Sequence, residues 1–223
     1  STRPMSVIYG IDALDHAGST VASDDINGDG FDDVIIGAAA LGTLRNAYNI
    51  AGGAGDGPNN ERHNAGEVYV VFGRPDLPRD IDLNANPPQD LLVVYGADGG
   101  ENSPDRLGEE IVTADINGDG LADMLLGAYR ADGPGNSRPD AGDVCVVYGA
   151  RDLPGRVIDL VDPPEGTMLI YGARDQAIAG DAIAAGDIHG DGYDDLFIGV
   201  PGDDGPLDRP FSGGIVVIAG GPN

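Results

Sequence analysis

The stretch Asp25-Ile-Asn-Gly-Asp-Gly-Phe-Asp-Asp33, followed at once by the apolar run Val34-Ile-Ile-Gly37, decides the fold because it occurs three times in the chain. The second copy is Asp115-Ile-Asn-Gly-Asp-Gly-Leu-Ala-Asp123, and the third is Asp187-Ile-His-Gly-Asp-Gly-Tyr-Asp-Asp195. The first aspartates of successive copies are 90 and 72 residues apart. Self-similarity of this kind indicates a protein built from repeated supersecondary units.

Other segments recur around the loop in a fixed order, and they define four short strands per unit. One strand ends at the first aspartate of the loop, and a second follows the loop directly. The third strand of each unit is apolar at nearly every position, and it lies in Ala65-Gly-Glu-Val-Tyr-Val-Val-Phe-Gly73, in 141–149 and in 212–220. The fourth ends in a Tyr-Gly pair, as in Val93-Val-Tyr-Gly96, in 169–172 and in Val7-Ile-Tyr-Gly10.

The pattern of apolar residues predicts an all-β fold made of β-propeller blades of four antiparallel strands. The second and third strands are apolar at nearly every position, so both of their faces should be buried, and stacked blades supply that burial. The first strand is rich in small residues such as Ser19, Ala22 and Ser23, which suits the crowded axis of a ring. A β-sandwich is the alternative, but it would not require a repeated unit.

The repeat boundaries predict one domain over 1–223 with three blades. We expect them at about 18–96, 107–172 and 180–220, the third blade lacking its fourth strand. The N-terminal segment 6–9 matches that missing strand and could supply it in cis or in trans. Known propellers have about four to eight blades. We therefore predict a homodimer in which two chains close a six-bladed ring by exchanging N-terminal strands. A piece cut from a longer propeller is the other interpretation.

Each loop offers several oxygen ligands at alternate positions, which predicts calcium sites. Ca²⁺ prefers six to eight hard oxygen ligands, and close carboxylates repel one another without a cation. Side chains at positions one, three, five and nine and the carbonyl at position seven are the expected ligands, with water completing each shell. They are Asp25, Asn27, Asp29, Phe31 and Asp33; Asp115, Asn117, Asp119, Leu121 and Asp123; and Asp187, His189, Asp191, Tyr193 and Asp195.

The third loop departs from the pattern because His189 stands at the position of Asn27 and Asn117. Imidazole nitrogen is a poor ligand for a hard cation, so we expect the third of the three calcium sites to be the weakest. An EF-hand is excluded, since its twelfth position needs a bidentate Glu, and the first loop has Ile36 there. The alternative for any single loop is an Asn-Gly or Asp-Gly hairpin with solvated acids.

Composition narrows the possible partners. The 38 acidic and 12 basic residues give a net charge of -26, which disfavours nucleic acid and anionic membrane surfaces. No apolar run is long enough for membrane insertion, and the absence of a recognisable signal peptide leaves a cytosolic, a processed or a partial chain. The single Cys145 excludes an internal disulfide. None of the three His has a Ser or Cys partner at a recognisable spacing, so we expect no catalytic residues and no enzyme.

These loops and strands resemble FG-GAP repeats, the blade unit of the integrin α-subunit propeller and of many bacterial surface proteins. The eponymous positions differ: Ala17-Gly18, Leu107-Gly108 and Ala179-Gly180 stand where Phe-Gly is usual, and Gly37-Ala-Ala39, Gly127-Ala-Tyr129 and Gly199-Val-Pro201 stand where Gly-Ala-Pro is usual. The resemblance implies structural calcium in the hairpins and a role in cell adhesion or recognition of a protein or glycan ligand. It implies an extracellular, cell-surface or periplasmic location. The alternative is a lectin or a polysaccharide-degrading enzyme on the same propeller.

Overall fold

A computed structural model describes residues 5–12, 15–39, 55–85, 90–100, 104–206 and 209–222. Fourteen β-strands and two short 3-10 helices, Pro58–Asn60 (η1) and Pro134–Asn136 (η3), form the regular structure of these residues, without an α-helix. The all-β prediction is thus confirmed. Parts of the first predicted blade, at 40–54 and 86–89, lie outside the described residues.

The first large sheet contains five strands in the order β10-β6-β4-β3-β2. Its strands are β2 (Thr20–Asp24), β3 (Asp33–Ala38), β4 (Glu67–Val71), β6 (Leu91–Tyr95) and β10 (Val157–Asp159). The first four are antiparallel neighbours, as the four strands of the first repeat predict. The fifth strand, β10, comes from the following repeat and runs parallel to β6.

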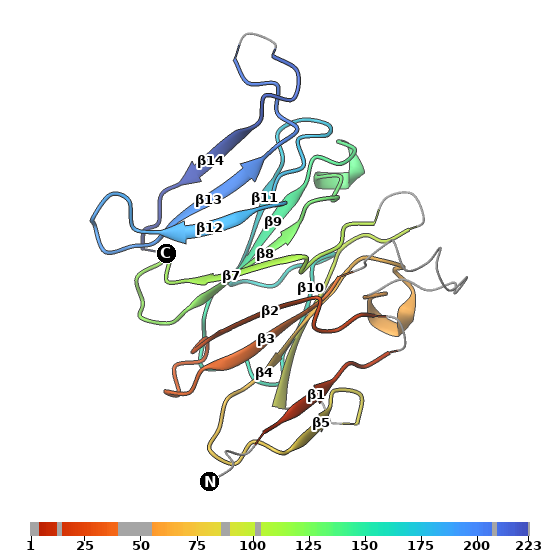
Figure 1. Cartoon of the computed structure of the whole chain (residues 1–223), viewed down its shortest axis with the longest axis vertical. Helices are drawn as coiled ribbons and strands as arrows, with labels where there is room; N and C mark the ends of the chain where they lie inside the picture. Colours follow the sequence, from red (N-terminus) through yellow and green to blue (C-terminus); the bar gives the residue numbers. More distant parts are fainter. Residues whose placement is uncertain are drawn as a thin grey trace.

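The other two large sheets repeat this antiparallel order, with four strands (β11-β9-β8-β7) and three strands (β12-β13-β14). The strands of the second sheet are β7 (Glu110–Ala114), β8 (Asp123–Ala128), β9 (Asp143–Val147) and β11 (Thr167–Tyr171). Those of the third sheet are β12 (Ile183–Gly186), β13 (Asp195–Val200) and β14 (Gly214–Ile218). The three sheets follow one another along the molecule, and β7 contacts β2 on one side and β12 on the other (Figure 1).

The N-terminal strand forms a separate pair. β1 (Val7–Tyr9) runs parallel to β5 (Asp80–Asp82), with Ile8 opposite Ile81. This pair has the same form as β6 and β10, in which Val94 lies opposite Ile158. β1 and β14 lie toward opposite ends of the long axis of the molecule (Figure 1). Within this chain β1 therefore does not pair with the third sheet.

The hydrophobic core lies between the sheets. Successive side chains of the central strands point alternately to the two faces of a sheet, so each strand contributes to the core on both sides. Val68 and Val70 of β4 pack toward the second sheet, in one cluster with Met124 of β8, while Tyr69 lies in a separate cluster on the other face. Val144 of β9 packs with the third sheet in a further cluster. Successive strand residues point to opposite faces, so a strand that is apolar at every position needs packing on both sides. The sheets are stacked in this way, as the sequence predicts.

Candidate metal centres

Each predicted calcium loop is the tight hairpin that joins the first strand of a sheet to the second. The first loop connects β2 to β3, and it bends at Gly28 and Gly30, whose φ angles are 72° and 91°. Residues with a Cβ rarely adopt this left-handed region, so the two glycines make the turn possible. The loop brings the side chains at positions one, three, five and nine into one hairpin, as expected from the spacing.

The carboxylate of Asp25 organises the first loop through three backbone N–H groups. Its Oδ1 atom accepts hydrogen bonds from Gly28 (2.7 Å) and Asp29 (3.1 Å), and its Oδ2 atom accepts one from Gly30 (2.8 Å). Asn27 Oδ1 accepts from the N–H of Asp29 at 2.9 Å. These bonds hold the loop in a shape that directs backbone donors inward at acidic side chains.

Asp33, at position nine of the loop, is fully buried. Its two oxygens accept hydrogen bonds from the N–H groups of Ile26 (3.2 Å) and Gly73 (2.8 Å). Burial raises the pKa of Asp33 to about 6, in spite of these two hydrogen bonds, and the nearby carboxylates of Asp29 and Asp25 raise it further. The three acids are therefore close enough to repel one another, which is the electrostatic setting that a cation would relieve.

The second loop repeats this pattern bond for bond. Asp115 accepts from Gly118 (2.7 Å), from Asp119 (3.1 Å) and from Gly120 (2.9 Å). Asp123 is as buried as Asp33, and it accepts from the equivalent two N–H groups at 3.0 and 2.8 Å. Burial raises the pKa of Asp123 to about 6 as well. Two hairpins about 90 residues apart in sequence thus have one hydrogen-bond geometry.

The third loop keeps the bonds to its first aspartate but differs at His189. Asp187 accepts from Gly190 (2.6 Å), from Asp191 (3.2 Å) and from Gly192 (2.9 Å). The His189 ring lies with Nδ1 2.8 Å from Oδ2 of Asp195, at position nine, whereas Asn27 and Asn117 bond to the aspartate at position five. Burial alone would raise the pKa of Asp195, but backbone N–H groups and the His189 ring hold it below its usual value.

The first loop is held by hydrogen bonds and side-chain packing from the second sheet. The N–H groups of Ala122 and Ala150 donate to the carbonyls of Asp25 (3.3 Å) and Ile26 (3.0 Å). The side chain of Leu121 covers Gly28 so closely that a Cβ there would lie 2.5 Å from Leu121 Cδ2. The sequence predicts only a carbonyl role for Leu121, and the structure shows that its side chain also packs between two sheets.

The second loop is held in the same way by hydrogen bonds and side-chain packing from the third sheet. The N–H groups of Asp194 and Gly221 donate to the carbonyls of Asp115 (3.1 Å) and Ile116 (2.9 Å). Tyr193 covers Gly118, where a Cβ would lie 2.4 Å from Tyr193 Cε1. The loops therefore belong to the packing between sheets as well as to individual hairpins.

The donor set of the loops fits calcium by its chemistry. All predicted ligands of the first two loops are carboxylate, amide or carbonyl oxygens, which hard cations prefer. The side chains of Asp25, Asn27, Asp29 and Asp33 would hold the ion in the first loop, and the ion would neutralise their charge. Across the described ranges, no three His, Cys, Asp or Glu side chains already stand in an arrangement suited to holding one metal ion.

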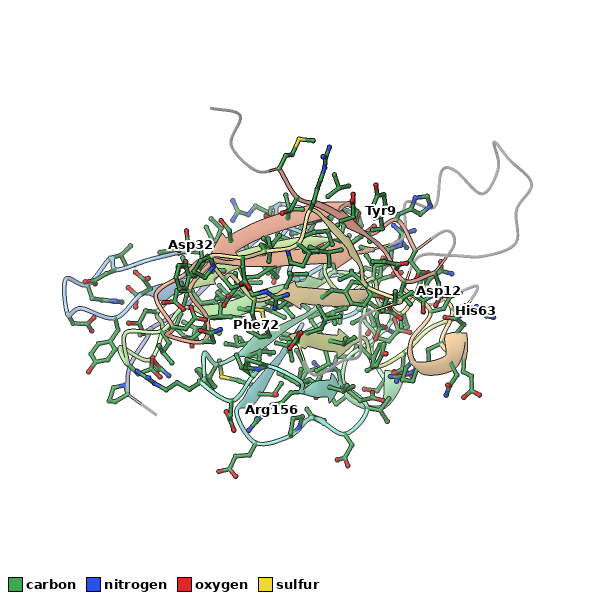
Figure 2. All side chains as sticks on the ribbon, turned by 90° about the horizontal axis from the view of Figure 1, so that it is seen from below. Tyr9, Asp12, Asp32, His63, Phe72 and Arg156 are labelled. Atoms are coloured by element: carbon green, nitrogen blue, oxygen red, sulfur yellow. The ribbon has the colours of Figure 1, made fainter. Side chains whose placement is uncertain are left out.

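A second group of acids lies at the other end of the strands, and sequence analysis did not single it out. Asp98, Asp105, Asp132 and Asp143 line a pocket of about 220 Å³ that also reaches Leu169. Burial raises the pKa of Asp105 to about 8 and that of Asp143 to about 7. Figure 2 shows the two ends of the strands, with Asp32 of the first loop on one side and Asp12 and His63 on the opposite side.

This second group repeats in the first sheet, where Asp15 and Glu67 occupy the positions of Asp105 and Asp143. Burial raises the pKa of Asp15 to about 6 and that of Glu67 to about 7. The matching positions of the third repeat are Ala177 and Gly214, so the pattern ends there. The sequence signal that could have found this group is the pair of acids at matched places in two repeats.

Comparison with known proteins identifies the repeats. The sequence model of one protein family, the FG-GAP repeat, matches residues 107–147 and 179–218, which include the second and third loops. Integrin alpha-PS5 of Drosophila melanogaster is 28% identical over 207 residues, which are 90% of this chain and 16% of that protein. The chain therefore contains FG-GAP repeats in these two ranges.

Enzymes also appear among the relatives. Phosphatidylinositol-glycan-specific phospholipase D of Homo sapiens is 36% identical over 99 residues, or 43% of this chain and 11% of that protein. The Mus musculus protein of the same name is 31% identical over 188 residues, or 82% of this chain and 18% of that protein. The chain thus spans less than a fifth of the length of these relatives.

These names contradict the prediction that the chain is not an enzyme. That prediction came from the lack of a recognisable arrangement of nucleophile and base, which is a local signal. A local signal does not show that stretches of proteins named for a phospholipase activity are similar to this chain. Among the described residues, no helix is both long and apolar enough to cross a membrane.

Proposed function

We propose that the chain is a calcium-stabilised propeller module that presents its loops for extracellular recognition or adhesion. The observation that carries this proposal is the shared hydrogen-bond geometry of the loops at Asp25 and Asp115, each with a fully buried carboxylate at position nine. Calcium has a structural role in this proposal: it neutralises mutually repelling acids at the edges of packed sheets.

Electrostatics support calcium over solvated hairpins. A solvated acid keeps its ordinary pKa, whereas burial raises the pKa of Asp33 and of Asp123 to about 6. Ionised at neutral pH, these groups have only backbone N–H groups to compensate them. A divalent cation bound among the three acids of a loop would supply the missing positive charge.

Calorimetric titration of the metal-free protein with CaCl₂ tests this proposal directly. We expect up to three bound ions per chain, with the site of Asp187 the weakest, and an increase in melting temperature on calcium addition. Magnesium serves as the control, because it demands near-octahedral geometry and dehydrates reluctantly, so it should raise the melting temperature less. Identical melting curves in calcium and in EDTA, with no heat of binding, would contradict the proposal.

The recognition role is supported by the likeness to integrin alpha-PS5 over most of the chain. Loop faces of rigid scaffolds commonly carry binding residues. An extracellular or periplasmic location would expose the loops to calcium and to ligands. Protease accessibility of the protein on intact source cells, compared with a cytosolic marker, tests the location. A glycan array and an array of extracellular-matrix proteins, each probed in calcium and in EDTA, test the two kinds of ligand.

A second candidate function is participation in a phosphatidylinositol-glycan-specific phospholipase D activity. The names of several relatives favour it, and the 188-residue match to the Mus musculus protein covers most of this chain. The test is release of a glycosylphosphatidylinositol-anchored reporter from detergent micelles by the purified chain. Release above that of a heat-denatured sample supports this function, and an equal background in both samples rejects it for the chain alone.

A further inference from the structure

We propose that the pocket between the first and second sheets binds a small phenol, with its ring beside Cys145 and its hydroxyl on the carboxylate of Asp143. The pocket has a volume of about 220 Å³, and both sheets that enclose it contain all four strands of their repeats. Asp143 pairs with Ala128, at the end of β8 that lies away from the calcium loop. The proposal therefore stands apart from metal binding and from the proposed recognition role.

The first sheet shows what fills this place in a matched repeat. Tyr69 and Cys145 are the third residues of β4 and β9, which are equivalent strands of two repeats. Tyr69 lies opposite Val93 of β6. Cys145 lies opposite Leu169, at the matching position of β11. Tyr69 is fully buried, so its ring and hydroxyl fill the interior there, whereas the side chain of Cys145 offers neither group.

The acid at the start of the same strand also lacks a partner in the second sheet. In the first sheet the Tyr69 hydroxyl donates to Oε2 of Glu67, and the N–H of Gly57 donates to Oε1 of Glu67 at 2.8 Å. Asp143 occupies the position of Glu67 in the second sheet. Its Oδ1 atom is buried and has no hydrogen-bond partner among the described residues. A buried acceptor without a donor costs free energy, so a ligand hydroxyl at this atom would be stabilising.

The apolar part of the pocket suits an aromatic ring. The apolar side chains that line it include Leu107, Ala128, Cys145, Leu160 and Leu169. Leu107 stands where the first repeat has Ala17, so it fills part of the space that the missing tyrosine ring leaves. An apolar cavity of about 150 Å³ is large enough to bind benzene. The 220 Å³ of this pocket therefore leaves room for a ring that carries a hydroxyl.

The polar part of the pocket favours a neutral hydrogen-bond donor. Asp98, Asp105, Asp132 and Asp143 line it, and no basic side chain among the described residues does so, which disfavours an anion. Burial is the largest cause of the raised pKa of both Asp105 and Asp143, so the interior is poorly solvated and disfavours a charged ligand. A phenol supplies one donor without a charge, as Tyr69 does in the first sheet.

Saturation-transfer NMR titrations of the full chain with phenol and with toluene test the proposal. The two compounds have nearly the same shape, but toluene leaves Oδ1 of Asp143 without a donor. We therefore expect the dissociation constant of phenol to be lower than that of toluene by about tenfold or more. Equal affinities, or binding of neither compound, would overturn the proposal. Binding of glucose without binding of phenol would identify a sugar site and would also reject it.

Two variants and a matched control locate the bound phenol. Cys145→Tyr places a phenol of the chain itself in the pocket, so it should abolish binding of free phenol. Cys145→Ser keeps the small side chain, so phenol should still bind. Asp143→Leu removes the acceptor at a similar size, so it should abolish the preference for phenol over toluene while toluene still binds.

Circular dichroism checks that each variant keeps the β-sheet spectrum of the unmodified chain, and Asp143→Leu carries the test if Cys145→Tyr fails to fold. Phenol that binds equally well to Cys145→Tyr, or an unchanged preference for phenol in Asp143→Leu, would place the ligand elsewhere and refute the proposal.

Discussion

Replacing Asp29 by Asn should remove most of the calcium-dependent stability of the first loop while leaving the metal-free protein nearly unchanged. Oδ1 of Asp29 accepts a hydrogen bond from the N–H of Phe31 at 2.9 Å, and an Asn oxygen can accept the same bond. The substitution therefore removes a charge and the bond that Oδ2 of Asp29 accepts from the Asn27 amide at 3.3 Å, but it keeps the backbone bond of the hairpin. In the absence of metal it also relieves repulsion with Asp33, whose pKa the Asp29 carboxylate helps to raise.

The size of the effect follows from linkage. A site that is occupied at 100 times its dissociation constant stabilises the fold by about 2.7 kcal/mol. If losing one of three carboxylates weakens the site about a hundredfold, the remaining stabilisation is about 0.4 kcal/mol by the same relation. The loss of about 2.3 kcal/mol corresponds to about 5–9 °C in melting temperature for a chain of this size.

The assay is differential scanning calorimetry in calcium and in EDTA. The control is Asp32→Asn, which removes the same charge from the same hairpin at an exposed residue that is not a proposed ligand. We expect the calcium-induced rise in melting temperature to shrink in Asp29→Asn and to persist in Asp32→Asn. Equal rises in both variants would show that Asp29 is not a ligand and would remove the basis for assigning position five of all three loops.

Three further predictions follow from the loops and the buried acids. Gly118→Ala should destabilise the protein more than Gly120→Ala in thermal melts, because both have positive φ but only the first Cβ would meet Tyr193 at 2.4 Å, and nothing lies within 4 Å of the second. His189→Asn should tighten the weakest calcium site in calorimetric titration, and an unchanged affinity would reject the role of His189 in weakening it. Burial raises the pKa of Asp105 to about 8, so the folded protein holds this proton more tightly than the unfolded chain does. The contribution of Asp105 to the free energy of unfolding is therefore complete below about pH 4. It declines as the pH rises to 8, by up to about 1.4 kcal/mol per pH unit. Urea unfolding in EDTA at pH 5 and 8 should therefore show a smaller loss for Asp105→Asn than for the unmodified chain, and equal losses would contradict the assignment.

The hairpins and central strands could be predicted from sequence because their determinants are local. Gly30 and Asp33 fix the turn and the start of the next strand within a few residues, and the apolar run of β4 requires burial on both faces. The fourth strand of the first repeat, predicted to end at the Tyr95-Gly96 pair, is β6, which ends at Tyr95. Repetition strengthened each of these inferences, because a local pattern that recurs three times has few alternative explanations.

The short parallel strands could not be predicted in the same way. Ile81 and Ile158 recur in matched Ile-Asp-Leu segments, but β5 and β10 contain three residues each, too few for a periodic signal. Both become strands only because a fourth strand, β1 or β6, lies beside them in space. Sequence repeats located these segments without revealing what they pair with.

The two groups of buried acids, in the pocket and at the matching place of the first sheet, were missed for a related reason. Asp and Glu are almost always exposed unless paired, so a sequence argument assigns Asp105 and Glu67 to the surface. In the structure they are 5% and 3% exposed, because the ends of neighbouring strands and the connecting loops close over them. Such residues become buried together only when two sheets pack, and the sequence around each residue does not indicate that burial.

The calcium loops and the packing between sheets are parts of one structure, which determines where metal would act. Ile26 lies between two proposed ligands, Asp25 and Asn27, yet it is fully buried in the core between the first and second sheets. A cation that fixes the loop would therefore also fix a core side chain, and its loss would loosen the contact between sheets before it affected hydrogen bonds within them. Ile188 is 61% exposed and has no such contact with the described residues, so the third loop should gain the same coupling only when a neighbouring sheet covers it.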